Sequence, residues 1–368
     1  MAEYIIQEES VTKLADAIRE KFKYLDALDS FISDRKSHNT NVFLENATTI
    51  SNQVFRCCSG LVDVSLPEEI EDIGAQAFYD CTNLALTRLP ESLTSIGNYA
   101  FRNCTNLALT ALPEGVTSIG EGAFGGCTNL ALTSLPDGIT AIKNYTFQEC
   151  TNLALTSLPE SVMDIGVDAF SICKNLSLTF LPSALTNIDD RAFYYCTSIA
   201  LTSLPESVTH IGNCAFSGCT GLTLTQLPAG VTSIEYEAFN NCTNLALTSL
   251  PDGITTINRR TFRKCTNLAL ASLPESVTYI ADYAFNYCEK LALTQLPAGI
   301  TYIGNNSFGY CTGLTSLTFK GMPTDISSYA FSRCTNLTTI NVPWAEGEVA
   351  NAPWGATNAT INYNYVEE

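Results

Sequence analysis

Basic residues are scarce in this sequence, and those present form no run. The 368 residues include 19 lysines and arginines against 37 aspartates and glutamates, a formal net charge of -18. Proteins that bind the phosphates of nucleic acids need a concentrated positive surface. The composition therefore argues against a DNA- or RNA-binding function.

Long apolar runs are also missing. Although 46% of the residues are hydrophobic, no segment approaches the roughly 20 apolar residues that cross a bilayer. At the amino terminus, Glu3, Glu8 and Glu9 lie where a secretory signal has basic residues. We therefore expect an ordered, soluble chain without membrane insertion or a visible secretory signal.

Motifs that carry catalysis are absent as well. The two histidines, His38 and His210, fall into no Ser-His-Asp, Cys-His or HExxH arrangement, and glycine-rich phosphate loops do not occur. An acidic pair such as Asp189-Asp190 is more typical of solvated surface than of acid-base chemistry. We predict that the protein is not an enzyme and uses no cofactor.

Cysteine, by contrast, is abundant and regularly spaced. Thirteen of the 15 cysteines recur at intervals of 23 residues, and phenylalanine and isoleucine columns keep the same step. These cysteines are Cys58, Cys81, Cys104, Cys127, Cys150, Cys173, Cys196, Cys219, Cys242, Cys265, Cys288, Cys311 and Cys334. Because one such unit cannot bury its apolar side chains alone, the units must stack into a solenoid.

The repeat itself suggests local structure. A typical unit, residues 127–149, reads CTNLALTSLPDGITAIKNYTFQE. Its NLALTSLP stretch is β-prone and ends at a proline, which donates no ladder hydrogen bond, so we predict a strand there, parallel to its counterparts. The later Ala-Phe dipeptide of most units favours a short α- or 3₁₀-helix.

Together these columns resemble the BspA-like leucine-rich repeats over roughly residues 43–356. The resemblance implies an α/β solenoid of about 13 units, with parallel β-strands stacked along one face. Most units depart from the family in placing leucine three, five and eight residues after the cysteine, as at Leu84, Leu86 and Leu89, rather than three, six and eight. We therefore expect a bulge or irregular strand in the middle units.

The two ends differ from the repeats. An apolar stripe that includes Val11, Ile18 and Leu25 predicts an amphipathic helix over residues 10–33, which either caps the first repeat or forms the seam of a homo-oligomer. We favour the cap. At the other end, Ile361, Tyr363 and Tyr365 alternate with polar residues, as in a final strand. We thus divide the chain into an N-terminal cap or attachment module (1–42), the solenoid (43–356) and a C-terminal cap (357–368).

Both flanks carry a second resemblance. The segments YIIQEESVTKLADAIREKF and VPWAEGEVANAPWGATNATINYNY are similar to the opening and closing segments of tail-associated proteins of phages and prophages that infect Firmicutes. This resemblance implies a virion protein, or a prophage product made in the bacterial cytoplasm, that serves host attachment. A bacterial cell-surface or secreted adhesin and a purely structural spacer remain alternatives.

The thiol column has a simple interpretation. A 23-residue step lays the cysteines in a line with side chains pointing the same way, which suits neither a zinc tetrahedron nor a disulfide. We predict no metal site and a row of buried, reduced thiols. Cys214 belongs to a polar column and should be exposed, and Cys57 is a second exception.

Recognition should involve columns that change from unit to unit. Late in the array, tyrosines fall one repeat apart beside a basic cluster, and both residue types are frequent in binding hot spots. The candidate surface consists of Tyr279, Tyr283, Tyr287, Tyr302, Tyr310, Arg259, Arg260 and Lys264. Its expected partner is a cell-surface protein or glycan, and the alternative is that the stacked tyrosines only stabilise neighbouring turns.

Overall fold

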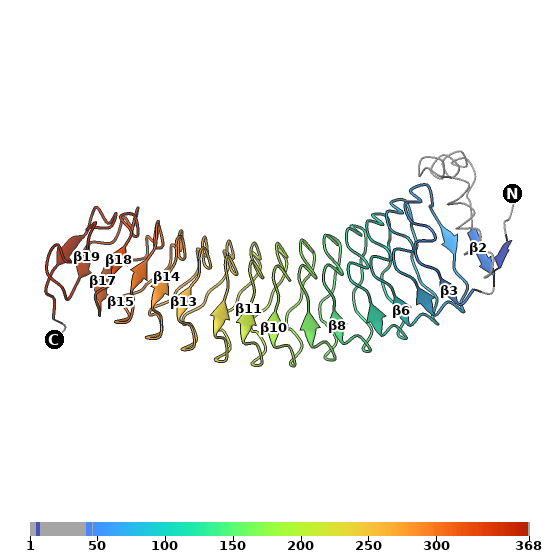
Figure 1. Cartoon of the computed structure of the whole chain (residues 1–368), viewed down its shortest axis with the longest axis horizontal. Coiled ribbons are helices and arrows are strands. Elements are labelled where there is room, and N and C mark those ends of the chain that lie inside the picture. The colour runs from blue at the N-terminus through green and yellow to red at the C-terminus, as the bar shows by residue number, and fades with distance from the viewer. Residues whose placement is uncertain (1–4, 8–41, 46, 367–368) are drawn as a thin grey trace. The chain divides into compact units, whose positions relative to one another are not determined.

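Each 23-residue unit forms one coil, as the repeat predicts. The structure is a computed structural model and describes residues 5–7, 42–45 and 47–366. It divides into two compact units, Met1–Leu178 (unit 1) and Thr179–Glu368 (unit 2), which we describe separately (Figure 1). In each unit the coils lie side by side and their strands pair in parallel.

The described residues of unit 1 form three parallel sheets, with strand orders β1-β2-β4, β3-β5-β6-β7 and β8-β9. Its strands are β1 (Ile5–Gln7), β2 (Val42–Glu45), β3 (Thr49–Ile50), β4 (Val64–Ser65), β5 (Asp72–Ile73), β6 (Ser95–Ile96), β7 (Ser118–Ile119), β8 (Ala141–Ile142) and β9 (Asp164–Ile165). Most are two residues long and end at the framework isoleucine.

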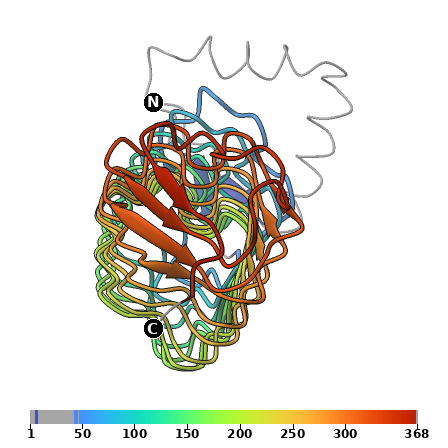
Figure 2. The same ribbon diagram turned by 90° about the vertical axis from the view of Figure 1, so that its left-hand side faces the viewer.

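Unit 2 also contains three parallel sheets, with orders β10-β11-β12, β13-β14-β16-β18 and β15-β17-β19-β20. Its strands are β10 (Asn187–Ile188), β11 (His210–Ile211), β12 (Ser233–Ile234), β13 (Thr256–Ile257), β14 (Tyr279–Ile280), β15 (Gln295–Leu296), β16 (Tyr302–Ile303), β17 (Ser316–Phe319), β18 (Asp325–Ile326), β19 (Thr339–Asn341) and β20 (Thr360–Asn362). Figure 2 shows the long red and orange strands of the C-terminal sheet on one side of the coil.

The pairing register places each framework residue beside its copy in the next coil. Ile73 pairs with Ile96 in unit 1, and Ile280 pairs with Ile303 in unit 2. The phenylalanines stack in the same way, with 5.2 Å between the ring centroids of Phe78 and Phe101. The cysteine, leucine, isoleucine and phenylalanine columns together form the core of each unit. The predicted columns of buried residues are therefore confirmed.

The predicted strand over the NLALTSLP stretch is wrong for most coils. In the middle coils this stretch is irregular, and the regular strand lies instead at the later Ser-Ile or equivalent pair. Leu107, Leu109 and Leu112 are nevertheless all buried, although a strand with strict alternation would turn the third away from the first two. The irregularity expected from the leucine spacing is thus the feature that brings all three side chains into the core.

The short helix predicted at the Ala-Phe dipeptide is also wrong, since the described residues contain no helix. Consecutive turns occupy this segment instead. The backbone N–H groups of Gln76, Phe78 and Asp80 donate to carbonyls of the next coil, whereas that of Ala77 donates back to Gly74. A helix would turn all of these donors inward along its own axis, so the stacking of coils outcompetes helix formation.

The predicted end structures have different outcomes. The amphipathic helix expected over residues 10–33 lies outside the described residues, and its choice between cap and oligomer seam stays a prediction. The strands on either side of it, β1 and β2, pair with each other, and β2 pairs with β4. At the carboxyl end the expected final strand is confirmed only at Ile361, which pairs in β20 with Ile340 of β19. Tyr363 and Tyr365 lie beyond the strand.

Candidate functional site

Two positions in each turn segment carry side chains that change from coil to coil. These positions lie five and one residues before the framework cysteine, and most of them adopt a left-handed backbone with φ between 49° and 79°. In the coil that ends at Cys288 they are Tyr283 (φ 58°) and Tyr287 (φ 62°). We call the position just before the cysteine the turn column. A non-glycine residue pays a conformational cost there.

Tyr287 and Tyr310 form a stacked pair in the turn column of unit 2. Their ring centroids lie 4.3 Å apart and the planes differ by 8°. The backbone N–H of Tyr287 donates to the carbonyl of Gly309 at 2.8 Å, and that of Tyr310 to Ser332 at 2.9 Å. A hydrogen bond with Tyr310 raises the pKa of the Tyr287 phenol, so its hydroxyl stays protonated at neutral pH. The pair offers hydroxyl groups at the surface.

Tyr279 and Tyr302 form a second pair, but in the strand column that precedes the framework isoleucine. They are register partners in β14 and β16, with ring centroids 4.7 Å apart. Burial raises the pKa of Tyr302, and the neighbouring Asp282, Tyr279 and Asp325 raise it further. The sequence therefore predicted both stacked pairs correctly, while the structure assigns them to two different segments of the repeat.

The basic cluster does not form one free patch. Arg260 donates from Nη1 to Glu237 Oε1 at 2.9 Å, and its guanidinium lies 5.7 Å from the ring centroid of Tyr283. Arg259 lies instead over the ring of Tyr236, 6.0 Å from its centroid. Lys264 is exposed in the turn column, one coil before Tyr287. Of the predicted cations, Arg260 is thus held by its contacts with Glu237 and Tyr283, whereas Lys264 faces solvent.

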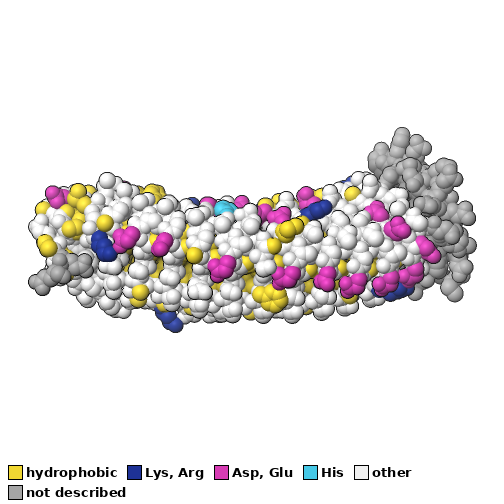
Figure 3. Space-filling model, turned by 90° about the horizontal axis from the view of Figure 1, so that it is seen from below, with side chains coloured by type: hydrophobic (Ala, Val, Ile, Leu, Met, Phe, Trp, Pro, Cys, Tyr) yellow, Lys and Arg dark blue, Asp and Glu magenta, His cyan; other side chains and the backbone are white. Residues whose placement is uncertain are grey.

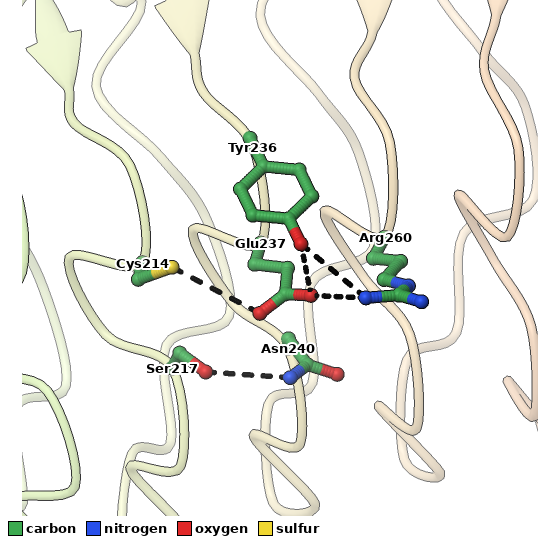
Figure 4. A network of polar contacts seen from close by, with 6 residues as sticks. All are labelled: Cys214, Ser217, Tyr236, Glu237, Asn240 and Arg260. Carbon is green, nitrogen blue, oxygen red and sulfur yellow. Dashed lines mark hydrogen bonds and ion pairs between the residues drawn. The ribbon is translucent and has the colours of Figure 1, made fainter.

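The sequence analysis missed the network that holds Arg260 (Figure 4). Tyr236 donates its hydroxyl to Glu237 at 2.7 Å, and Arg260 joins the same carboxylate. Burial opposes the charge on Glu237, whose side chain is 16% exposed, but the hydrogen bonds from Tyr236 and Arg260 outweigh it and lower the pKa of Glu237. The sequence signal that could have revealed the ion pair of Glu237 and Arg260 is the presence of opposite charges 23 residues apart, one repeat length.

Cys214 belongs to the same network and corrects a prediction. The thiol is half-buried rather than exposed, and its Sγ lies 3.9 Å from Glu237 Oε2. Burial, followed by the charge of Glu237, raises the pKa of Cys214 to about 11. A thiol with such a pKa is almost entirely protonated at neutral pH, so Cys214 is a poor nucleophile.

The framework cysteines are buried, as predicted. Their Sγ atoms are close to the phenylalanine carbonyl of the preceding coil, as with Cys242 and Phe216 at 3.0 Å. Desolvation by burial raises the pKa of Cys242 well above its usual value. No group of three or more metal-ligating side chains occurs among residues 47–366, and no helix in the described segments could span a membrane.

These features define a class of protein: a leucine-rich-repeat solenoid in which a fixed hydrophobic framework carries variable side chains. The model of the BspA type leucine rich repeat region matches residues 29–154, 117–246 and 232–351, and the chain belongs to that family. Such solenoids are typically non-enzymatic binding scaffolds.

Similar solved structures include three bacterial proteins. A leucine-rich repeat protein from Bacteroides ovatus is 25% identical, with a TM-score of 0.63 and coverage of 86% of this chain and 87% of that one. A leucine rich cell surface protein from Faecalibacterium prausnitzii is 26% identical, with a TM-score of 0.46 and coverage of 87% and 84%. The pneumococcal vaccine antigen PcpA is 17% identical, with a TM-score of 0.51 and coverage of 87% and 85%. A search of curated proteins found no match.

Proposed function

We propose that this protein is a non-enzymatic recognition protein that binds a cell-surface ligand through the tyrosine-rich surface of unit 2. The observation that carries the proposal is the pair of stacked tyrosines, Tyr287 and Tyr310, at left-handed positions beside Lys264. Tyrosine combines contact area with a hydrogen-bonding hydroxyl and is enriched among residues that dominate binding energy.

The setting we propose is host attachment by a phage or prophage tail. Its support is the similarity of the two terminal segments to those of Firmicutes phage tail-associated proteins. A second candidate is a bacterial surface adhesin, which membership in the BspA type family favours because proteins of this family are often found at the cell surface. Both candidates use the same binding surface and differ in the particle or cell that carries it.

Binding to whole cells tests the proposal. The fluorescently labelled full chain is titrated against Firmicutes cells and against animal epithelial cells, and bound protein is measured by flow cytometry. Because hot-spot residues typically contribute about 2 kcal/mol or more, Tyr287→Ala with Tyr310→Ala should weaken binding roughly thirtyfold. Selective binding to Firmicutes cells favours the tail protein, and selective binding to epithelial cells favours the adhesin.

The control must lie in the same column without disturbing the backbone. Gly126 is unsuitable because its φ of 76° and the contact of an added Cβ with Asn103 would strain any substitution. Glu149→Ala meets the requirement, since Glu149 is an exposed, left-handed residue of the turn column in unit 1. An equal loss for the control and the tyrosine variant, or binding to no cell type, contradicts the proposal and leaves a structural spacer.

A further inference from the structure

The turn column of unit 2 carries an unusual series of side chains in four successive coils. These are Lys264, Tyr287, Tyr310 and Arg333, in the order cation, tyrosine, tyrosine, cation. All four have a φ of 62°. Lys264, Tyr310 and Arg333 are exposed, and Tyr287 is half-buried in its stack with Tyr310. No carboxylate interrupts the series.

Stability alone does not account for this series. A left-handed backbone costs a side-chain-bearing residue roughly 1–2 kcal/mol, which glycine avoids and asparagine reduces. The same column uses Gly218 and Asn241 elsewhere in unit 2. Ring stacking offsets part of this free-energy cost for the two tyrosines, but it offsets none of the cost at Lys264 or Arg333. Asp80, Glu149 and Ile172 occupy the same left-handed column, so this cost is common to the coils. The distinguishing feature of these four coils is that two cations flank a stacked tyrosine pair with no carboxylate between them.

We propose that the series Lys264–Tyr287–Tyr310–Arg333 binds an anionic polysaccharide, which rests on the proposed function and names its class of ligand. The two cations lie three coils apart, roughly 14 Å at the spacing of paired strands. One carboxylate does not span that distance, so the ligand must repeat its negative groups along its length. Between the cations, the phenolic hydroxyls of the stacked tyrosines donate and accept hydrogen bonds, as sugar hydroxyls require.

Backbone geometry favours a polysaccharide over an acidic peptide. A peptide commonly binds by adding a strand to a sheet edge, which requires free backbone N–H groups. The N–H groups of Lys264, Tyr287 and Tyr310 already donate to the next coil, at 2.7, 2.8 and 2.9 Å. A polysaccharide needs no backbone partner, because its own hydroxyls and anionic groups engage the side chains.

Nearby charges set the strength of the site. The pKa of the Tyr287 phenol is raised mainly by its hydrogen bond with Tyr310, and the charge of Arg263 opposes that rise, so Arg263 adds positive charge beside the series. Glu289, exposed two residues after Tyr287, supplies a negative charge at its flank. More distant carboxylates are largely screened at physiological ionic strength, where the Debye length is about 8 Å. Removing Glu289 should therefore strengthen anion binding, and reversing Lys264 or Arg333 should weaken it.

The test measures binding of the full chain to four immobilised polymers by biolayer interferometry. These are polygalacturonate, dextran sulfate, uncharged dextran and poly-L-glutamate. We expect binding to the two anionic polysaccharides and little to dextran or poly-L-glutamate. Lys264→Glu and Arg333→Glu should each weaken polygalacturonate binding by about tenfold, and Glu289→Gln should strengthen it about twofold. Tyr287→Phe with Tyr310→Phe should weaken it by removing the hydroxyls.

Lys143→Glu is the matched control, since Lys143 is an exposed cation of unit 1 outside the turn column. An equal effect of Lys143→Glu, or equal binding to dextran or poly-L-glutamate, overturns the inference. Cell binding by the wild type without retention on either anionic polysaccharide also overturns it, while the proposed recognition function stands. Failure to bind both cells and polysaccharides contradicts both.

Discussion

At the scale of single residues, contacts with the neighbouring coil explain why a cysteine or a left-handed backbone occurs at a given position. The thiol of Cys265 lies 3.0 Å from the carbonyl of Phe239 in the preceding coil, so it is both a small apolar group and a donor. The N–H of Lys264 points to the carbonyl of Asn286 in the following coil and thereby fixes the left-handed backbone. The residue found at such a position is therefore determined largely by its contacts with the neighbouring coils.

Cys214 should react slowly with thiol reagents at neutral pH. Its pKa of about 11 means that the thiolate fraction rises about tenfold for each pH unit between 7 and 10. We expect iodoacetamide labelling of the native protein, followed by mass spectrometry, to show this rise at Cys214 and little labelling of the buried column. Glu237→Gln should accelerate labelling of Cys214 by removing a neighbouring negative charge. Rapid, pH-independent labelling of Cys214 would contradict the network in Figure 4.

Lys264→Gly should separate stability from binding. Glycine relieves the cost of a φ of 62°, so the free energy of unfolding should rise by about 1 kcal/mol in urea titrations, while polygalacturonate binding falls. The comparison is Lys290→Gly, at an exposed position whose backbone is not left-handed, which should lower stability slightly. A loss of stability in Lys264→Gly would show that the lysine side chain supports the fold.

At the scale of the element, the coil is held by short strands on one side and by turns that donate to the following coil on the other. The residue that follows a strand donates to the preceding coil, as when the N–H of Gly120 donates to Ile96. Turn residues donate to the following coil, as when the N–H of Phe124 donates to Thr146. Both sets of bonds require close approach of successive backbones. In several coils the residue after the two-residue strand is glycine, which permits this approach, whereas Lys143, Glu235 and Ala281 occupy the equivalent position in other coils.

Gly120→Ala tests that close approach. A Cβ at this position would overlap the backbone nitrogen of Asn98 and the carbonyl carbon of Gly97, neither of which belongs to a flexible side chain. We expect a loss of about 2–4 kcal/mol in the free energy of unfolding, measured by urea titration. The matched control is Gly230→Ala, whose Cβ would meet its nearest atom at 3.8 Å and should be close to neutral. Similar effects of the two substitutions would refute the role of glycine at the strand end.

At the scale of the whole molecule, acidic side chains are not only numerous but also recur at the same position of successive coils. In unit 1 the residue after the framework proline is an exposed carboxylate in five successive coils: Glu68, Glu91, Glu114, Asp137 and Glu160. Figure 3 shows a row of acidic side chains along this part of the surface. Arg88, 2.7 Å from Glu68, lowers the pKa of that carboxyl by a hydrogen bond. Like charges on neighbouring coils repel and reduce stability.

Salt should therefore stabilise the protein. Raising sodium chloride from about 0.02 to about 0.5 M shortens the Debye length below the coil spacing and should raise the unfolding temperature by about 2–4 °C in scanning calorimetry. Glu114→Gln, in the middle of the acidic row, should stabilise the protein by about 0.2–1 kcal/mol at low salt. Glu275→Gln is the control of opposite sign, because Glu275 forms an ion pair with Lys320 at 2.9 Å. An unfolding temperature that falls with salt would contradict this account.

Repeat spacing and residue type are enough to predict the solenoid, its buried columns and the two stacked tyrosine pairs. A constant step of 23 residues makes sequence spacing equal to spatial adjacency, so Tyr287 and Tyr310 had to meet once the coils stacked. Three features follow from the packing of coils against one another: the position of the strands, the turns in place of a helix at the Ala-Phe segment, and the half-buried thiol of Cys214 beside Glu237. Those outcomes depend on which donor and acceptor groups the neighbouring coil presents, and hydrophobic periodicity carries no information about them.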